Sequence, residues 1–179
     1  MGIVDRKVEG LPVGVSQGDV FSGGLVDYND AATAVTPLVV TGGGADVQLT
    51  NDTLGAFTNT AYLPVGVTSL WNAGTNQFDF SELKLGDMLD IRLELTADMG
   101  GPNSELEIDL ELGVGAGSYT IAFSRENYKT SGVKKIDRWN GIYLGDSNTL
   151  DNPARFIVRS DTNANVTVAG WYIKIIRKG

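Results

Sequence analysis

The chain has 179 residues, of which 42% are hydrophobic, and its 22 acidic and 14 basic side chains give a formal net charge of −8. This length fits one domain, with or without an extended arm, and the negative charge disfavours general nucleic-acid binding, which requires a positive surface. Cysteine and histidine are both missing, so disulfides, Cys/His zinc sites and a Ser-His-Asp hydrolase are excluded, whereas a glycosidase that uses carboxylates is not.

Residues 1–33 are predicted to form an extended N-terminal arm, separate from a domain at residues 34–179. Glycine and proline interrupt its short apolar pieces, so the segment is not expected to build a core. It is either a flexible terminus or an arm that docks on another subunit, and its apolar content favours docking because disordered tails are usually poor in such residues. The predicted contact residues in this arm are Leu11, Val13, Val15 and Phe21.

The N-terminus has no recognisable signal peptide, and no apolar run approaches the ~20 residues of a membrane span. We therefore expect no membrane partner.

Short strands are predicted at residues 36–40 and 45–50, separated by three glycines. The segment at residues 62–70 is broken by Pro64 and Gly66, which suits an edge strand or a connector.

The most regular pattern occupies residues 89–95 and 106–114, where aliphatic residues alternate with charged ones. This is the period of a half-buried strand, in which successive side chains point to opposite faces. A cluster of turn-forming residues at 98–104 separates the two runs. If the two strands form a hairpin, Glu94 faces Glu107; in a jelly roll they could instead lie in opposite sheets.

Further strands are predicted at residues 118–124, 156–159 and 166–176. Residues 125–138 are predicted to form a basic loop or a weak strand, and Asn140-Gly141 is a strong hairpin signal. The last strand is apolar on both faces, which suits a central strand covered twice or a strand at a subunit interface.

These patterns indicate an all-β fold, an antiparallel β-sandwich of roughly eight to ten strands with no convincing helix. The Cys-Trp-Cys pattern of immunoglobulin domains is missing, and the strand count fits a jelly roll, whose eight strands form two sheets.

Charge is segregated along the chain. Nine acids face two bases between residues 81 and 111, whereas ten bases face five acids from residue 125 onward. The acidic row could be a cation site or a glycosidase pair such as Glu94 and Glu107, but a uniform stripe lacks the contrasting environments that catalytic carboxyls need. We interpret it as a solvated face, which lysines of a partner could counter. The basic residues of segment 125–138 could grip phosphate or an acidic neighbour, although a solvated loop is favoured.

The turn at Asp161, Asn163 and Asn165 begins like a calcium-binding loop, but it lacks the glycine and the glutamate that such a loop requires, so we expect no metal site.

The aromatic residues could line a sugar platform, although burial in a core or an interface is favoured; they are Trp71, Trp139, Tyr143, Trp171 and Tyr172. Of these, Trp139, Trp171 and Tyr172 are predicted contact residues for a partner protein or a neighbouring subunit. We predict no catalytic residues, no cofactor and no enzymatic activity.

Four segments carry a resemblance: FDFSELKLGDMLDIRLEL (78–95), SYTIAFSRENYK (118–129), GIYLGDSNTLDNPARFIVRSD (141–161) and VAGWYIKII (168–176). In these strand-and-turn patterns the chain resembles the jelly-roll capsid decoration (cement) proteins and head-fibre domains of tailed bacteriophages, over residues 35–179. The resemblance implies a non-enzymatic virion protein, made in the host cytoplasm and placed on the capsid exterior. It implies a homo-oligomer, with a trimer expected, that contacts the major capsid protein.

Two rival classes stay open at the level of the sequence. One is a carbohydrate-binding or receptor-binding jelly-roll module that uses Trp71 or Trp139. The other is a glycoside hydrolase that uses Glu94 or Glu107. Fold alone cannot choose among these classes.

Overall fold

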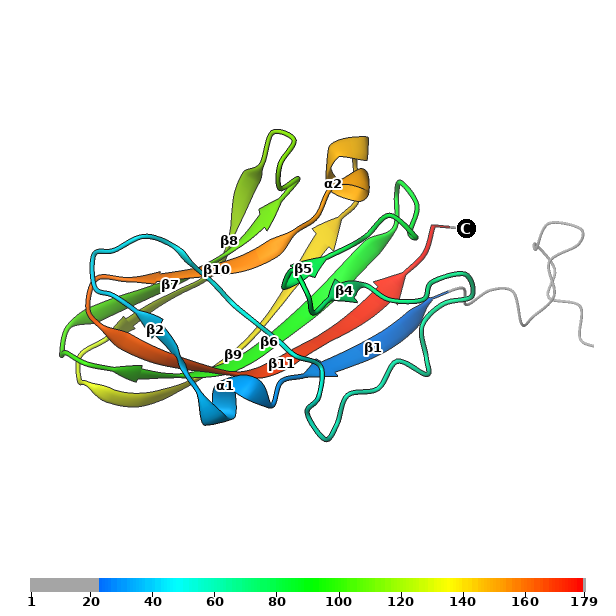
Figure 1. The fold of residues 1–179 in the computed structure, drawn as a ribbon. Helices are drawn as coiled ribbons and strands as arrows, with labels where there is room; N and C mark the ends of the chain where they lie inside the picture. Colours follow the sequence, from blue (N-terminus) through cyan, green and yellow to red (C-terminus); the bar gives the residue numbers. More distant parts are fainter. Residues whose placement is uncertain (1–22, 179) are drawn as a thin grey trace, which may run out of the picture.

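The computed structural model describes residues 23–178, and residues 1–22 and 179 lie outside the described part. Two antiparallel sheets stack face to face (Figure 1). Sheet A has the strand order β1-β11-β6-β9, with β2 also paired with β11, and sheet B has the order β3-β10-β7-β8. The strands of sheet A are β1 (Gly24–Asn29), β2 (Leu38–Val40), β6 (Met88–Met99), β9 (Gly132–Tyr143) and β11 (Ala164–Ile176); those of sheet B are β3 (Val47–Gln48), β7 (Ser104–Leu112), β8 (Tyr119–Tyr128) and β10 (Arg155–Ser160).

The order of these strands is that of a jelly roll. The eight main strands can be numbered one to eight along the chain: β1, β3, β6, β7, β8, β9, β10 and β11. In this numbering the strand order of sheet A is 1-8-3-6 and that of sheet B is 2-7-4-5. The first and last strands are therefore neighbours, and nearly every connection crosses between the sheets, as in a double Greek key. The predicted antiparallel jelly-roll sandwich is confirmed. Two short helices, α1 (Ala32–Val35) and α2 (Ser147–Asp151), lie in the connections.

The two long amphipathic strands lie in opposite sheets. β6 pairs with β9 and β11, whereas β7 pairs with β8 and β10. The hairpin alternative, with Glu94 opposite Glu107, is therefore wrong, and the alternative with the strands in separate sheets is correct. The turn between β6 and β7 carries the chain from one layer to the other, so both aliphatic stripes face the same core.

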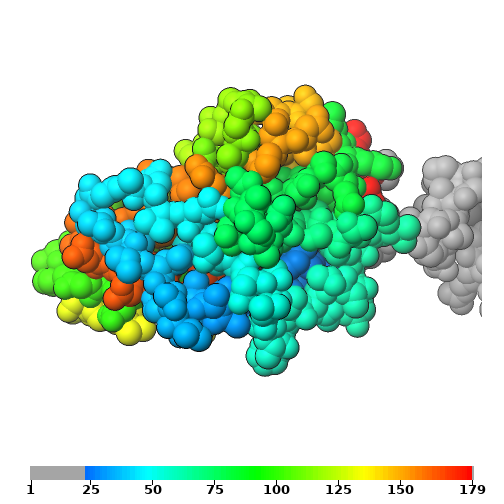
Figure 2. Space-filling model, in the orientation of Figure 1, coloured from blue at the N-terminus to red at the C-terminus, as the bar shows by residue number. Residues whose placement is uncertain are grey.

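The core lies between the sheets and is closed on one side by the long connection from β3 to β6. This connection contains a small hairpin of β4 (Trp71–Asn72) and β5 (Gln77–Phe78), and Figure 2 shows the connection covering the side of the sandwich that faces the viewer. Trp71 lies 4.5 Å from Trp171, and Phe78 lies 5.4 Å from Phe156, between ring centroids. Full burial of side chains of this size stabilises the folded state by about 1.5–3 kcal/mol each.

Two local predictions differ from the structure. Asn140-Gly141 is not a turn: both residues lie inside β9, opposite Ile91 and Asp90 of β6. Continuous pairing with a long central strand here overrides the local turn preference. The predicted arm ended at residue 33, but β1 is already hydrogen-bonded to β11, because its residues Val26 and Tyr28 bury their side chains in the core. An arm would therefore consist of residues before β1.

Candidate interaction surface

The outer face of sheet B carries a network of carboxylates and arginines. Asp109 of β7 contacts Arg125 of β8 at 2.8 Å and also pairs with Arg159 of β10. Glu107 lies 2.5 Å from Arg159 and 3.4 Å from Arg125. The hydrogen bond with Glu107 is the main cause that raises the pKa of Arg159 above its usual value. The acidic stripe of β7 is therefore neutralised by arginines of the two adjacent strands.

Glu111 continues this network at the end of β7, where Arg155 of β10 donates a 2.6 Å hydrogen bond to its carboxylate. Burial acts to raise the pKa of Glu111, but the hydrogen bonds from Arg155 and Ser118 outweigh it and leave the pKa below its usual value. The stripe thus lies on the outer face, as predicted, and its charge is countered by arginines of the same chain, a role predicted from the sequence for lysines of a partner.

The carboxylates do not form the catalytic pair considered from the sequence. Glu94 lies on β6 at the outer face of sheet A, whereas Glu107 lies on β7 at the outer face of sheet B. The whole sandwich separates them, so they cannot act on one glycosidic bond, which requires two carboxyl groups within about 5–9.5 Å.

The loop that resembles the start of a calcium site uses its oxygens to hold the backbone. Asp161 accepts a hydrogen bond from the backbone N–H of Glu105 at 2.7 Å, and Asn163 accepts one from Gly42 at 2.9 Å. Within residues 23–178, no group of three or more acidic side chains is arranged to hold a metal ion.

The basic segment 125–138 forms the end of β8 and the beginning of β9 rather than a free loop. Lys135 pairs with Glu94 at 3.0 Å, and Arg138 pairs with Glu126 of β8. Lys134 donates to the Thr130 hydroxyl and lies 5.6 Å from the centre of the Tyr128 ring. These cations are thus engaged within the chain, which disfavours the alternative of a phosphate grip.

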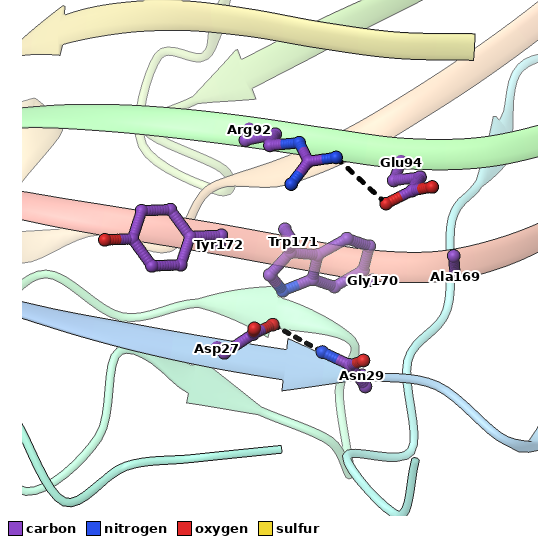
Figure 3. A pocket seen from close by; sticks show the side chains of 8 residues that line it. All are labelled: Asp27, Asn29, Arg92, Glu94, Ala169, Gly170, Trp171 and Tyr172. Carbon is purple, nitrogen blue, oxygen red and sulfur yellow. Dashed lines mark hydrogen bonds and ion pairs between the residues drawn. The ribbon is translucent and has the colours of Figure 1, made fainter. Parts of the chain in front are cut away.

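A depression of about 100 Å³ lies on sheet A, beside a bulge in β11 between Val168 and Gly170. Figure 3 shows Arg92 and Glu94 side by side on β6, and Asp27 and Asn29 together on β1. The Asn29 amide donates to the Asp27 carboxylate. Burial is the main cause that raises the pKa of Asp27, against the opposing effects of Asn29 and Arg92.

Arg92 is the central cation of this face. It contacts Asp137 of β9 at 2.9 Å and Glu94 at 3.2 Å. The hydrogen bond with Asp137 is the main cause that raises the pKa of Arg92, and the same bond lowers the pKa of the Asp137 carboxyl. The charged groups of the depression are therefore largely satisfied by one another, whereas the buried indole N–H of Trp171, which also lines it, finds no hydrogen-bond partner among the described residues.

Apolar side chains gather beside this polar cluster, on the same face of sheet A. Trp139 of β9 is 52% exposed and its ring centroid lies 5.7 Å from that of Tyr172 on β11. Met88 is paired in register with Tyr143 on one side and with Ile176 on the other, and all three are exposed. We call these five residues the sheet-A patch: Met88, Trp139, Tyr143, Tyr172 and Ile176.

The structure separates the contact residues predicted from the sequence. Trp139 and Tyr172 come together in the sheet-A patch, whereas Trp171 is only 1% exposed and packs in the core, so it cannot contact a partner without unfolding. Trp71 is buried too, and its indole N–H donates to the backbone carbonyl of Asn51. The other predicted contacts, Leu11, Val13, Val15 and Phe21, lie outside the described residues.

Sequence reasoning missed Met88 and Ile176. The signal was available in the phase of the alternation: counting by two from Arg92 and from Tyr172 places Met88 and Ile176 on the outer face. Nothing in the sequence, however, indicated that β6 lies between β9 and β11. This order brings the five residues to one face, in two groups with Asp90, Gly141 and Lys174 in register between them. No helix in the part of the chain that the structure covers has the length and apolar character needed to cross a membrane.

No family model matches the chain, and no curated protein matches it either. Among solved structures, the chain is similar to PRD1 vertex protein P5, at 16% identity and a TM-score of 0.46, over 88% of this chain and 73% of the other. It is also similar to the Eiger TNF from S. frugiperda, at 9% identity and a TM-score of 0.45, over 89% and 93% of the two chains. A third similarity, to a chain of the infectious bursal disease virus Gt strain, has 16% identity and a TM-score of 0.40, over 79% of this chain and 33% of the other. Likenesses this distant establish neither a family nor a function.

Proposed function

We propose that this chain is a structural virion protein that decorates or cements the capsid of a tailed bacteriophage as a homotrimer. It sits on the capsid exterior and stabilises the shell through non-covalent contacts with the major capsid protein and with its own copies. The observation that supports this role best is the sheet-A patch, a group of exposed apolar side chains on one face of a rigid sandwich, because exposed patches of this kind mark surfaces that bind other proteins.

The remaining polar chemistry fits a role in assembly better than one in catalysis. Three carboxylates of β7 are paired with arginines, those of Glu107, Asp109 and Glu111. Glu94 and Glu107 lie on opposite faces of the sandwich. Such pairing fixes the strands relative to one another and leaves these carboxylates without the contrasting environments of an acid and a base.

The N-terminal segment supplies the contact with the shell in this proposal. The side chains that bind the major capsid protein or a neighbouring subunit are Leu11, Val13, Val15 and Phe21, because burial of apolar side chains drives most association between proteins. Deleting residues 2–22 is a cleaner test than a longer deletion because it stops before β1, whose pairing with β11 belongs to the sandwich.

The experiment is co-sedimentation of the purified chain with shells of the major capsid protein. We expect the deletion of residues 2–22 to abolish attachment while circular dichroism and the unfolding midpoint stay those of the full chain. The double variant Leu11→Asp/Phe21→Asp, with the arm at full length, should also lose attachment. Undiminished attachment of both variants would contradict the role of the arm.

A carbohydrate-binding module is the second candidate. Trp139 and Tyr172 lie side by side next to a polar depression, as the stacking surface of a sugar site would. Trp71 no longer belongs to this alternative because it is buried. Glycan binding by the full chain that disappears in Trp139→Ala would favour this module over the virion role.

A further inference from the structure

We propose that the sheet-A patch and the polar groups around it form the interface through which copies of this chain associate. The inference rests on the proposed function, since it names the surface that the oligomer uses. The occupant of the patch is a second copy of the chain, and the area, the composition and the charge of this face support that choice.

The exposed apolar area has the size of an interface centre. Trp139 is 52% exposed, Tyr143 61%, Met88 43% and Ile176 39%. With about 150–250 Å² for a large aromatic side chain, these residues present on the order of 400 Å² of apolar surface. A stable interface buries about 800 Å² on each partner. The patch therefore supplies the centre, and the polar remainder of sheet A supplies the rim.

The composition of the face matches the centres of interfaces between proteins. Such centres are enriched in tryptophan, tyrosine, methionine and arginine, and the patch contains the first three types, with Arg92 in register between Trp139 and Tyr172. All these residues lie on long strands of one sheet, so their positions are fixed before a partner arrives, which reduces the entropy lost on association.

The charge of this face favours a second copy over a charged partner. Two chains with a net charge of −8 repel each other, so they can meet only where charge is nearly balanced. On the outer face of sheet A, in register with residues 88 to 96 of β6, three basic side chains accompany four acidic ones: Arg92, Lys135 and Lys174 against Asp27, Asp90, Glu94 and Asp137.

The main ion pairs on this face are also formed within the chain, by Arg92 with Asp137 and Glu94 and by Lys135 with Glu94. Contact with an identical surface therefore does not strip these charges of their partners, which is the costly part of burying charge. A highly charged partner, in contrast, would find little unpaired charge here to complement.

The test compares the oligomeric mass of three proteins by size-exclusion chromatography with light scattering, over a dilution series. In Trp139→Glu the aromatic centre is replaced by a carboxylate. Phe57→Glu is the matched control, because Phe57 is also exposed but lies in the connection between β3 and β4, off the strands of the patch. Circular dichroism confirms that each variant is folded.

We expect the unmodified chain and Phe57→Glu to form the same oligomer. Trp139→Glu should raise the dissociation constant at least about 30-fold, the effect expected for a residue at the centre of an interface, and Trp139→Glu/Tyr143→Glu should run as a folded monomer. The inference is overturned if the double variant keeps the mass of the unmodified chain, or if the unmodified chain is a monomer at micromolar concentration.

Capsid co-sedimentation of the same proteins separates this inference from the proposed function. If the double variant stays oligomeric and still attaches to shells, the proposed interface is wrong but the proposed virion role is supported. A patch-dependent oligomer that never attaches to shells supports the interface and contradicts the virion role.

Discussion

Asp109→Asn tests whether the arginine network of sheet B stabilises the fold. The Asp109 side chain is only 3% exposed, and its carboxylate pairs with Arg159. The carboxylate also lies 2.8 Å from the guanidinium of Arg125, but this contact does not have the geometry of a hydrogen bond. Both arginines also contact Glu107, and they are 38% and 37% exposed. After the substitution, the two cations therefore keep one carboxylate and access to water.

The size of the effect follows from this difference in burial. A hydrogen bond to a charged group contributes about 1.5–3 kcal/mol, so the loss of one such bond and one close ion contact should lower the free energy of unfolding by about 2–3 kcal/mol. Replacing both arginines by methionine should cost more, about 3–5 kcal/mol, because it leaves the buried Asp109 carboxylate without a cation.

The assay is urea unfolding followed by tryptophan fluorescence, at one protein concentration because the proposed association would make stability concentration-dependent. Glu105→Gln, on the same strand and face, is the control and should change the free energy of unfolding by no more than about 0.5 kcal/mol. The reasoning is refuted if Asp109→Asn behaves like this control, or if the double arginine variant is the more stable of the two.

Two further predictions concern packing and pH. Gly170→Ala would place a Cβ 2.4 Å from the Tyr28 carbonyl oxygen and push β1 away from β11, so we expect thermal unfolding to show a free energy of unfolding lower by about 1–3 kcal/mol. The control is Gly141→Ala, whose Cβ would meet its nearest neighbour at 3.4 Å, and it should be nearly neutral. Equal losses in the two variants would contradict the close approach of β1 to Gly170. The pKa of Glu111 lies below its ordinary value of 4.5 in the folded chain, so its ionised form contributes stability above that value, and this contribution is lost as the pH falls through the folded pKa. Glu111→Gln should therefore lower stability at pH 7 and make the loss of stability below pH 4.5 shallower, and an unchanged acid slope would contradict this assignment.

The layers of the fold could be predicted from the sequence because they depend on alternation. Period-two patterns in β6 and β7 fix which side chains face the core, and those side chains are buried as predicted. The pairing of strands could not be predicted in the same way, because one hydrophobic stripe fits several partners equally well. The choice between a hairpin and separate sheets was decided by the whole topology, in which β10 and β11 complete the two sheets.

The candidate surface was predictable only in part. Trp139 and Tyr172 were singled out as contact residues, and the structure places their rings together. Trp171 was singled out in the same way but is buried, because the bulge between Val168 and Gly170 changes the phase of β11. A bulge of one residue moves every following side chain to the other face of the sheet, and no turn residue marks it unambiguously in the sequence.

The pairing of β7 carboxylates with arginines illustrates the same limit. Arg155 and Arg159 lie far from β7 in the sequence, whereas Arg125 lies on the next strand. Only the order β10-β7-β8 brings all three arginines to the two sides of β7. Segregation of charge along the chain is visible in the sequence, where the acidic row is interpreted as a solvated face that attracts lysines of a partner. In the structure this attraction operates within one subunit, between adjacent strands.

Electron cryo-microscopy of the virions that the proposed function implies tests the central claim most directly. We predict density for the two-sheet sandwich in multiple copies on the outside of the capsid shell, grouped in threes with their sheet-A patches facing one another. Shells that lack this density, or isolated copies whose sheet-A faces are open to solvent, would contradict the account.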